Sequence, residues 1–113
     1  MRRIYKLLDA ASWEAARAAG VFTGSAVDAR DGFIHFSDAA QAQETARLHF
    51  KGQSGLMLLT IDADQLGEAL KWEPSRGGAL FPHLYGPLAV TAVIAARLLE
   101  LDADGAPMLG PLG

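Results

Sequence analysis

Two histidine-containing segments carry the side chains of this chain that could do chemistry. The first reads Asp-Gly-Phe-Ile-His-Phe-Ser over residues 31–37, and the second reads Phe-Pro-His-Leu-Tyr-Gly-Pro-Leu over residues 81–88. Each places polar side chains among large apolar ones, which costs free energy unless the polar groups find partners. These two segments therefore form the candidate site.

In the first segment, His35 and Ser37 are the candidate ligand-binding pair. Side chains two positions apart on a strand return to the same face, so both can point toward one ligand. A helix that begins just after Ser37 would add backbone N–H groups and the positive end of its dipole, which favour phosphate or pyrophosphate. The alternatives are a structural His35 that is bonded to a carbonyl and a Ser37 that only caps the helix.

In the second segment, His83 and Tyr85 share the same alternation. His83 is a candidate to hydrogen-bond an anionic or ribose group, and Tyr85 is a candidate to cover a ring. Alternatively, Tyr85 packs in the core. Both histidine motifs could also be structural, with His35 and His83 joined to the backbone or to one another in a buried polar network.

Two further residues are candidates for chemistry. Glu73 lies between a tryptophan and a proline, an environment that could raise its pKa and suit acid–base catalysis, although an exposed loop carboxylate is the simpler interpretation. Arg76 could approach a phosphate as a fork of donors, or be solvated. The three histidines lack the spacing of a zinc site, so no metal is expected, and His49 is expected to be exposed.

Composition limits the kind of protein that can carry this site. A chain of 113 residues with 50% hydrophobic content can fold around one core. A net charge of −3 disfavours extended nucleic-acid binding but allows a small anionic ligand. The absence of cysteine suits a reducing cytoplasm, and neither a signal-peptide core nor a membrane span is expected. Oligomeric state cannot be inferred from composition.

Hydrophobic periodicity and capping residues divide the chain into alternating strands and helices. Strands are expected at residues 3–8, 32–36, 55–62 and 89–101, with a shorter strand at 71–73 and an extended segment at 80–85. Helices are expected at residues 13–19 and 39–50, a helical turn at 63–70, and loops at 23–31 and 74–78. The charged residues at the end of the first loop, Asp28, Arg30 and Asp31, are interpreted as solvated, with a gating role.

This order of elements predicts a single α+β domain with a mixed or mostly antiparallel sheet and about two helices. The domain is expected to span residues 1–101. Residues 102–113, rich in proline and glycine, are expected to form a flexible C-terminal tail.

The two histidine segments, together with the segments 58–62 and 71–74, resemble the bacterial domain-of-unknown-function family 952 over about residues 3–100. That family is similar in fold to ADP-ribosyltransferases and RNA 2′-phosphotransferases, in which a strand-borne histidine followed two residues later by serine or threonine contacts the ribose of NAD. The resemblance therefore implies an ADP-ribosyltransferase-like fold and NAD or an ADP-ribose-type ligand.

Under this resemblance, His35 and Ser37 would hold the nicotinamide ribose, and Tyr85 or Phe81 would stack on a ring. Cleavage of the nicotinamide–ribose bond builds positive charge on the sugar, which a carboxylate must stabilise. The chain has no Glu-x-Glu or Gln-x-Glu motif, and Glu73 is the candidate catalytic carboxylate. The alternative is a noncatalytic nucleotide-sensing or partner-binding module on the same fold.

Overall fold

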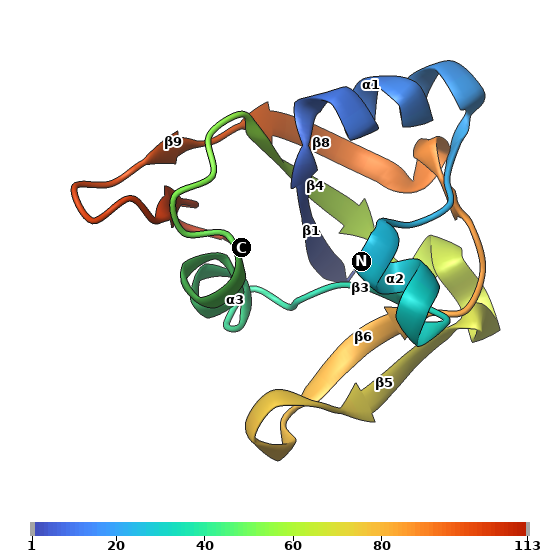
Figure 1. Ribbon diagram of the computed structural model, residues 1–113. Helices are drawn as coiled ribbons and strands as arrows, with labels where there is room; N and C mark the ends of the chain where they lie inside the picture. Colours follow the sequence, from blue (N-terminus) through green and yellow to red (C-terminus); the bar gives the residue numbers. More distant parts are fainter. Residues whose placement is uncertain (1, 113) are drawn as a thin grey trace.

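The main sheet is centred on β4 (Leu56–Asp62), the most apolar run of the chain. The structure is a computed structural model that describes residues 2–112, the side chain of Arg76 excepted. Strand β4 pairs antiparallel with β1 (Arg3–Asp9) on one edge and with β8 (Val93–Leu98) on the other (Figure 1). The strands expected at residues 3–8 and 55–62 are therefore confirmed.

Both faces of the main sheet are covered, which explains why β4 reads as a continuous apolar run. Ile4 and Leu8 belong to one buried cluster, and Tyr5 and Leu7 belong to another. Lys6 alternates with Ile4 and Leu8, so its side chain enters the face of the first cluster and is buried there. A lysine at this position needs a counter-charge inside the fold.

A second antiparallel sheet carries the histidines. It has the order β3 (Ile34–His35), β6 (Leu80–Leu84) and β5 (Leu70–Pro74), and β5 and β6 project as a hairpin away from the main sheet (Figure 1). The register places His35 opposite His83. Beyond β3, Ser37 pairs with Tyr5 of β1 through two backbone hydrogen bonds, which link the two sheets at the first histidine motif.

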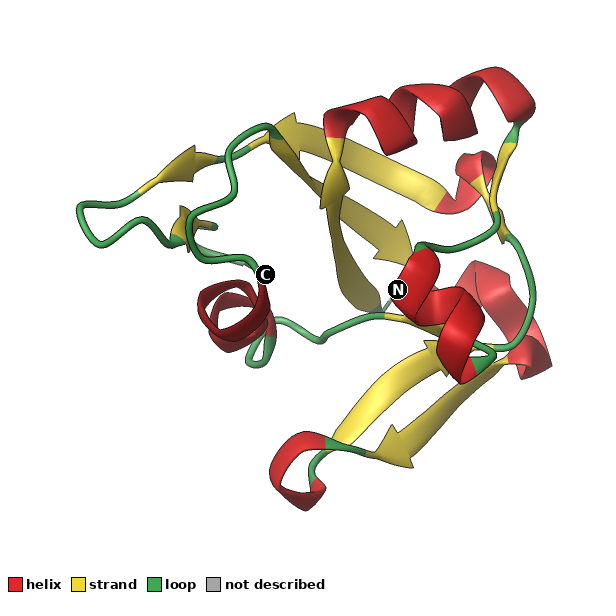
Figure 2. Cartoon of the chain, viewed as in Figure 1, coloured by secondary structure: helices red, strands yellow, loops and turns green. Residues whose placement is uncertain are grey.

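Helix α1 (Ala10–Ala19) confirms the first expected helix, although it begins earlier because Asp9 accepts a hydrogen bond from the backbone N–H of Ser12. It ends at Gly20, whose φ of 86° is the left-handed conformation that glycine adopts without strain. The expected helical turn is the 3₁₀ segment η1 (Ala63–Ala69). Figure 2 shows α1 and the shorter helices arranged around the strands.

The prediction of a loop at residues 23–31 is wrong, because this segment contains helix α2 (Ala26–Asp31). Ser25 and Asp28 form a capping box: the Ser25 hydroxyl accepts from the Asp28 N–H, and the Asp28 carboxylate accepts from the Ser25 N–H. The helix is too short for a clear hydrophobic period, so the cap was the only local signal. Asp28 is buried rather than solvated.

Two further elements differ from expectation at their boundaries. The helix expected at residues 39–50 is the shorter α3 (Ala42–His49), because Asp38 and Gln41 bond each other's backbone in a preceding turn. The strand expected at residues 32–36 is reduced to β3, because only Ile34 and His35 pair with β6 as a ladder.

The single strand expected at residues 89–101 is also wrong. The segment contains β7 (Leu88–Ala89), which pairs with β2 (Val21–Phe22), then η3 (Val90–Ala92), β8 and β9 (Glu100–Leu101). The 3₁₀ turn and a register shift in β4–β8 pairing break the strand. Ile94, which lies in the middle of the expected strand, is exposed.

The C-terminal segment that was expected to be a flexible tail folds back onto the domain. Its strand β10 (Pro107–Met108) pairs with β9, and Leu109 is fully buried. Gln43 on α3 fixes the segment by donating to the Pro107 carbonyl and accepting from the Leu109 N–H. The sequence did not predict this packing, because the segment has the composition of a turn and a single buried leucine gives no periodic pattern.

In the described part of the chain, no helix has the length and apolarity that crossing a bilayer requires.

Substitution of Leu109 by alanine should lower the free energy of unfolding by about 2–5 kcal/mol, because it leaves a cavity in the second buried cluster. The matched control is Leu98→Ala on β8, where the leucine is 62% exposed and the expected change is within about 0.5 kcal/mol. Urea unfolding measures both. Equal, small effects would show that the C-terminal segment does not contribute to the fold.

Candidate functional site

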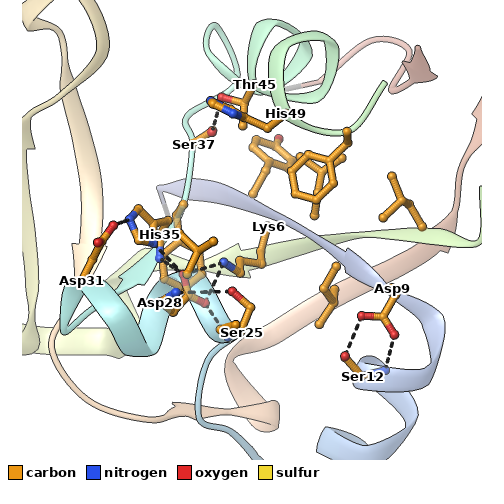
Figure 3. Close-up of a pocket in the computed structure, with 18 of the residues that line it drawn as sticks. Lys6, Asp9, Ser12, Ser25, Asp28, Asp31, His35, Ser37, Thr45 and His49 are labelled. Atoms are coloured by element: carbon orange, nitrogen blue, oxygen red, sulfur yellow. Dashed lines mark hydrogen bonds and ion pairs between the residues drawn. The ribbon is translucent and has the colours of Figure 1, made fainter. Parts of the chain in front are cut away.

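A cleft of about 620 Å³ opens between β1, α2, the first histidine motif and α3. We call it the main cleft. It brings together His35, Ser37 and His83 from the two predicted segments, and Figure 3 shows the labelled polar residues around it. Phenyl and phenol rings supply much of the remaining wall: Tyr5, Phe22, Phe36, Phe50 and Phe81.

His35 lies on the wall of the main cleft with its ring between two carboxylates. Nδ1 is 2.6 Å from Asp28 Oδ1, and Nε2 is 2.9 Å from Asp31 Oδ2 (Figure 3). The His35 backbone N–H also donates to Asp28 Oδ1, at 3.1 Å. The side chain is 33% exposed, so a ligand can reach the ring although its orientation is fixed from inside.

Asp28 is the residue that fixes this arrangement. Its carboxylate lies 3.1 and 3.3 Å from Lys6 Nζ and accepts the bonds from His35 and from the Ser25 N–H. Burial alone would raise the pKa of Asp28, but the adjacent Lys6 ammonium and the donated hydrogen bonds outweigh it, so the pKa is lowered. Asp28 therefore stays ionised inside the fold.

The sequence analysis did not name Lys6 as a site residue, although its position within an apolar strand indicated that it needs a buried partner of opposite charge. A lysine within an apolar strand that is buried on both faces must pair with a carboxylate, and Asp28 supplies it across the main cleft wall. Burial lowers the pKa of Lys6, and the charge and hydrogen bond of Asp28 only partly oppose that effect.

Ser37 is buried, and its hydroxyl is 3.1 Å from the Thr45 hydroxyl on α3. The expected cap at Ser37 is not formed, because α3 begins at Ala42. Ser37 and His35 both line the main cleft, as their spacing predicted, but each has a different polar partner. Thr45 on α3 and Ser37 form a hydroxyl pair.

The second motif forms a braced cluster next to the first. His83 Nδ1 is 2.8 Å from Glu73 Oε1, and the Tyr85 hydroxyl donates to the same oxygen at 2.7 Å. Phe33 stacks on His83, with ring centroids 4.0 Å apart, and its ring also lies 5.3 Å from that of Tyr85. Tyr85 is 46% exposed and does not pack in the core.

The structure corrects the electrostatic expectation for Glu73. Hydrogen bonds from Tyr85 and His83 lower the pKa of Glu73, whereas its sequence neighbours had suggested a raised value. The bond to Glu73 raises the pKa of Tyr85. Glu73 is outside the set of described residues that line the main cleft and reaches it only through His83.

Two residues that the sequence analysis named, Arg76 and His49, remain to be placed relative to the main cleft. The side chain of Arg76 is outside the described part of the structure. His49 is exposed, as expected, and contributes to the rim of the main cleft. The His35 and His83 rings meet edge to face with centroids 5.7 Å apart, and each binds its own carboxylate. Among residues 2–112, no group of three or more His, Asp or Glu side chains is placed to hold a metal ion.

Asp28→Asn should destabilise the protein by about 3–5 kcal/mol, because it leaves the Lys6 ammonium buried without a counter-charge. Asp31→Asn, which removes the exposed partner of the same histidine, should cost much less, because solvent screens an exposed ion pair. Urea unfolding distinguishes the two, and similar values would contradict the central role of Asp28.

The same pair predicts a pH dependence. Because the folded pKa of Asp28 is below its unfolded value of 3.8, the stabilisation is present above pH 3.8 and is lost as the pH falls through the folded pKa. Unfolding at a series of acidic pH values should therefore show a steeper loss of stability for the wild type than for Asp28→Asn. Parallel curves for the two proteins would refute this assignment.

Glu73→Gln should lower the pKa of Tyr85 toward about 10, the value for an unperturbed phenol. Absorbance titration of tyrosinate follows the change, and Tyr85→Phe identifies the transition, since the chain has 2 tyrosines. An unchanged Tyr85 transition would mean that the Glu73–Tyr85 hydrogen bond is not maintained in solution.

Comparisons with known proteins agree with this fold. The crystal structure of protein CC0527 from Caulobacter crescentus is 60% identical, with a TM-score of 0.94 over 96% of this chain and 95% of that one. The solution NMR structure of CC0527 has 60% identity and a TM-score of 0.87, covering 97% and 95% of the two chains. A search of curated proteins gave no match. The family model described as a protein of unknown function (DUF952) matches residues 7–96, and the chain belongs to this family.

Proposed function

We propose that this protein binds a small nucleotide-type ligand, NAD or ADP-ribose, in the main cleft, with His35 and Ser37 at a ribose. The observation that carries the proposal is that both side chains of the motif line one cleft of about 620 Å³. That volume is in the range of sites for small molecules and cofactors, about 300–1,000 Å³.

The chemistry of the cleft wall supports a ribosyl ligand. Ribose presents hydroxyls that both donate and accept, and the cleft offers the hydroxyl pair of Ser37 and Thr45. A ribose hydroxyl would bind His35 at Nε2 in place of the exposed Asp31 carboxylate. Aromatic rings that line the same cleft, among them Phe22 and Phe50, suit the stacking of a planar base. Small-molecule sites commonly combine an apolar wall with a few fixed polar groups.

Binding is better supported than glycosidic cleavage. An oxocarbenium-like sugar needs a carboxylate beside it, and Glu73 does not belong to the described cleft wall. Asp28 and Asp31 do line the cleft, but both already bind His35. This engagement favours, as the second candidate, a noncatalytic nucleotide-sensing module. Release of nicotinamide from NAD by the wild type would exclude that second candidate.

A thermal-shift titration with NAD and ADP-ribose tests the proposal. A ligand at a hundredfold excess over its dissociation constant adds about 2.7 kcal/mol to the stability of the folded state, which raises the midpoint by roughly 10 °C in a domain of this size. His35→Ala and Ser37→Ala should lose the shift, because both residues are proposed to contact the ribose.

His49→Ala is the matched control, since it removes an exposed histidine at the rim of the same cleft. It should keep most of the shift. If neither ligand raises the midpoint of the wild type, or if His35→Ala retains the full shift, then the ribose assignment is incorrect.

A further inference from the structure

Lys6 is a buried amine on the wall of the main cleft that the proposed ligand binding does not use. Its Nζ lies 5.9 Å from the ring centroids of both Phe22 and Phe36, and its charged partner is Asp28. All four residues line the cleft, so the amine is shielded from bulk solvent by rings but borders the space that a ligand would occupy.

Burial makes the Lys6 ammonium easier to deprotonate than that of an exposed lysine. Burial lowers the pKa of Lys6, and the opposing charge of Asp28 does not restore it. A neutral amine is a nucleophile and an ammonium is not, so Lys6 is more reactive at a given pH than an exposed lysine. The chain offers exposed lysines for comparison at Lys51 and Lys71.

A path for protons is connected to this amine. Asp28 bonds Lys6 on one side and His35 Nδ1 on the other, and His35 Nε2 bonds Asp31. The His35 ring is 33% exposed, so the path runs from the buried amine to the open part of the cleft (Figure 3). Imine formation requires this kind of path, because the carbonyl oxygen must collect two protons before it leaves as water.

We propose that Lys6 forms an imine with the aldehyde of a sugar held in the main cleft. The Lys6 ammonium first gives one proton to the path through Asp28 and His35, which releases it to solvent, and the neutral nitrogen then attacks the carbonyl carbon, so that a C–N bond forms. The carbonyl oxygen takes up the two amine protons, passed through Asp28 and His35, and leaves as water, so no oxidant or reductant is needed. His35 and Ser37 hold the sugar hydroxyls, a part of the inference that rests on the proposed function.

The chemistry separates two members of the proposed ligand class. ADP-ribose has a free anomeric carbon, so its terminal ribose opens to an aldehyde. In NAD, that carbon is closed by the bond to nicotinamide. ADP-ribose should therefore form the imine on Lys6 and NAD should not, although both fit the same cleft.

Borohydride trapping tests the inference on the intact protein. The wild type is incubated near neutral pH with glyceraldehyde, ADP-ribose or NAD and then reduced, and the adducts are located by peptide mass mapping. We expect both aldehydes to modify Lys6 in preference to Lys51 and Lys71, and NAD to give no adduct.

Two variants sharpen this test. Lys51 and Lys71 are both exposed, so their joint replacement in K51R/K71R leaves Lys6 as the sole lysine with the fold undisturbed. Adding K6R removes the target but keeps a positive charge opposite Asp28. Trapping on a lysine should persist in the first variant and disappear in the second. If the variant with K6R does not fold, peptide mass mapping of the adducts in K51R/K71R still shows whether Lys6 is modified.

The outcomes separate this inference from the proposed function. Glyceraldehyde trapped on Lys6, with neither trapping of ADP-ribose nor a thermal shift from it, supports the reactive amine and contradicts the ADP-ribose ligand. A thermal shift with ADP-ribose, but with Lys6 modified no faster than Lys51 and Lys71 by either aldehyde, supports the ligand and overturns the imine. An absence of both overturns both.

Discussion

The buried ion pair between Lys6 and Asp28 is the constraint on which the rest of the site depends. Lys6 points into the core face of β1 because it alternates with Ile4 and Leu8, and burial of an uncompensated ammonium would cost several kcal/mol. Asp28 supplies the counter-charge, and its remaining lone pairs accept from the Ser25 and His35 backbone and meet the His35 ring. One carboxylate thus ties the main sheet, α2 and the histidine sheet together.

This constraint assigns different roles to the two histidines, although they face one another across β3 and β6. His35 is oriented from within by Asp28 and keeps part of its ring at the main cleft. His83 is buried, stacked on Phe33 and held by Glu73, which also binds Tyr85. His83 therefore stiffens the strand opposite His35. A rigid neighbour of this kind reduces the ordering that ligand binding would otherwise require.

The sequence was sufficient where a signal was local or periodic. The apolar run predicted β4, and periodicity with capping residues predicted α1, although not its first turn. The spacing of His35 and Ser37 placed two side chains that line one cleft. The sequence was insufficient where contacts between residues distant along the chain determine burial, ion pairing or a pKa. Asp28 is partnered by Lys6, which is 22 positions away, and Leu109 is buried in a segment that Gln43 on α3 and strand β9 hold in place. Glu73 illustrates the same limit, since cross-strand donors rather than its sequence neighbours set its pKa.

Membership of the DUF952 family extends the fold to relatives but does not identify a ligand, so the central claim is that the main cleft is a ligand site. The most direct measurement is a two-dimensional amide NMR titration of the wild type with ADP-ribose. The proposed binding mode predicts the largest shifts at Lys6, Asp28, His35, Ser37 and Thr45, around one cleft, with the remote Ile94 and Leu98 on β8 unchanged. A spectrum that does not change, or shifts confined to β8, would contradict it.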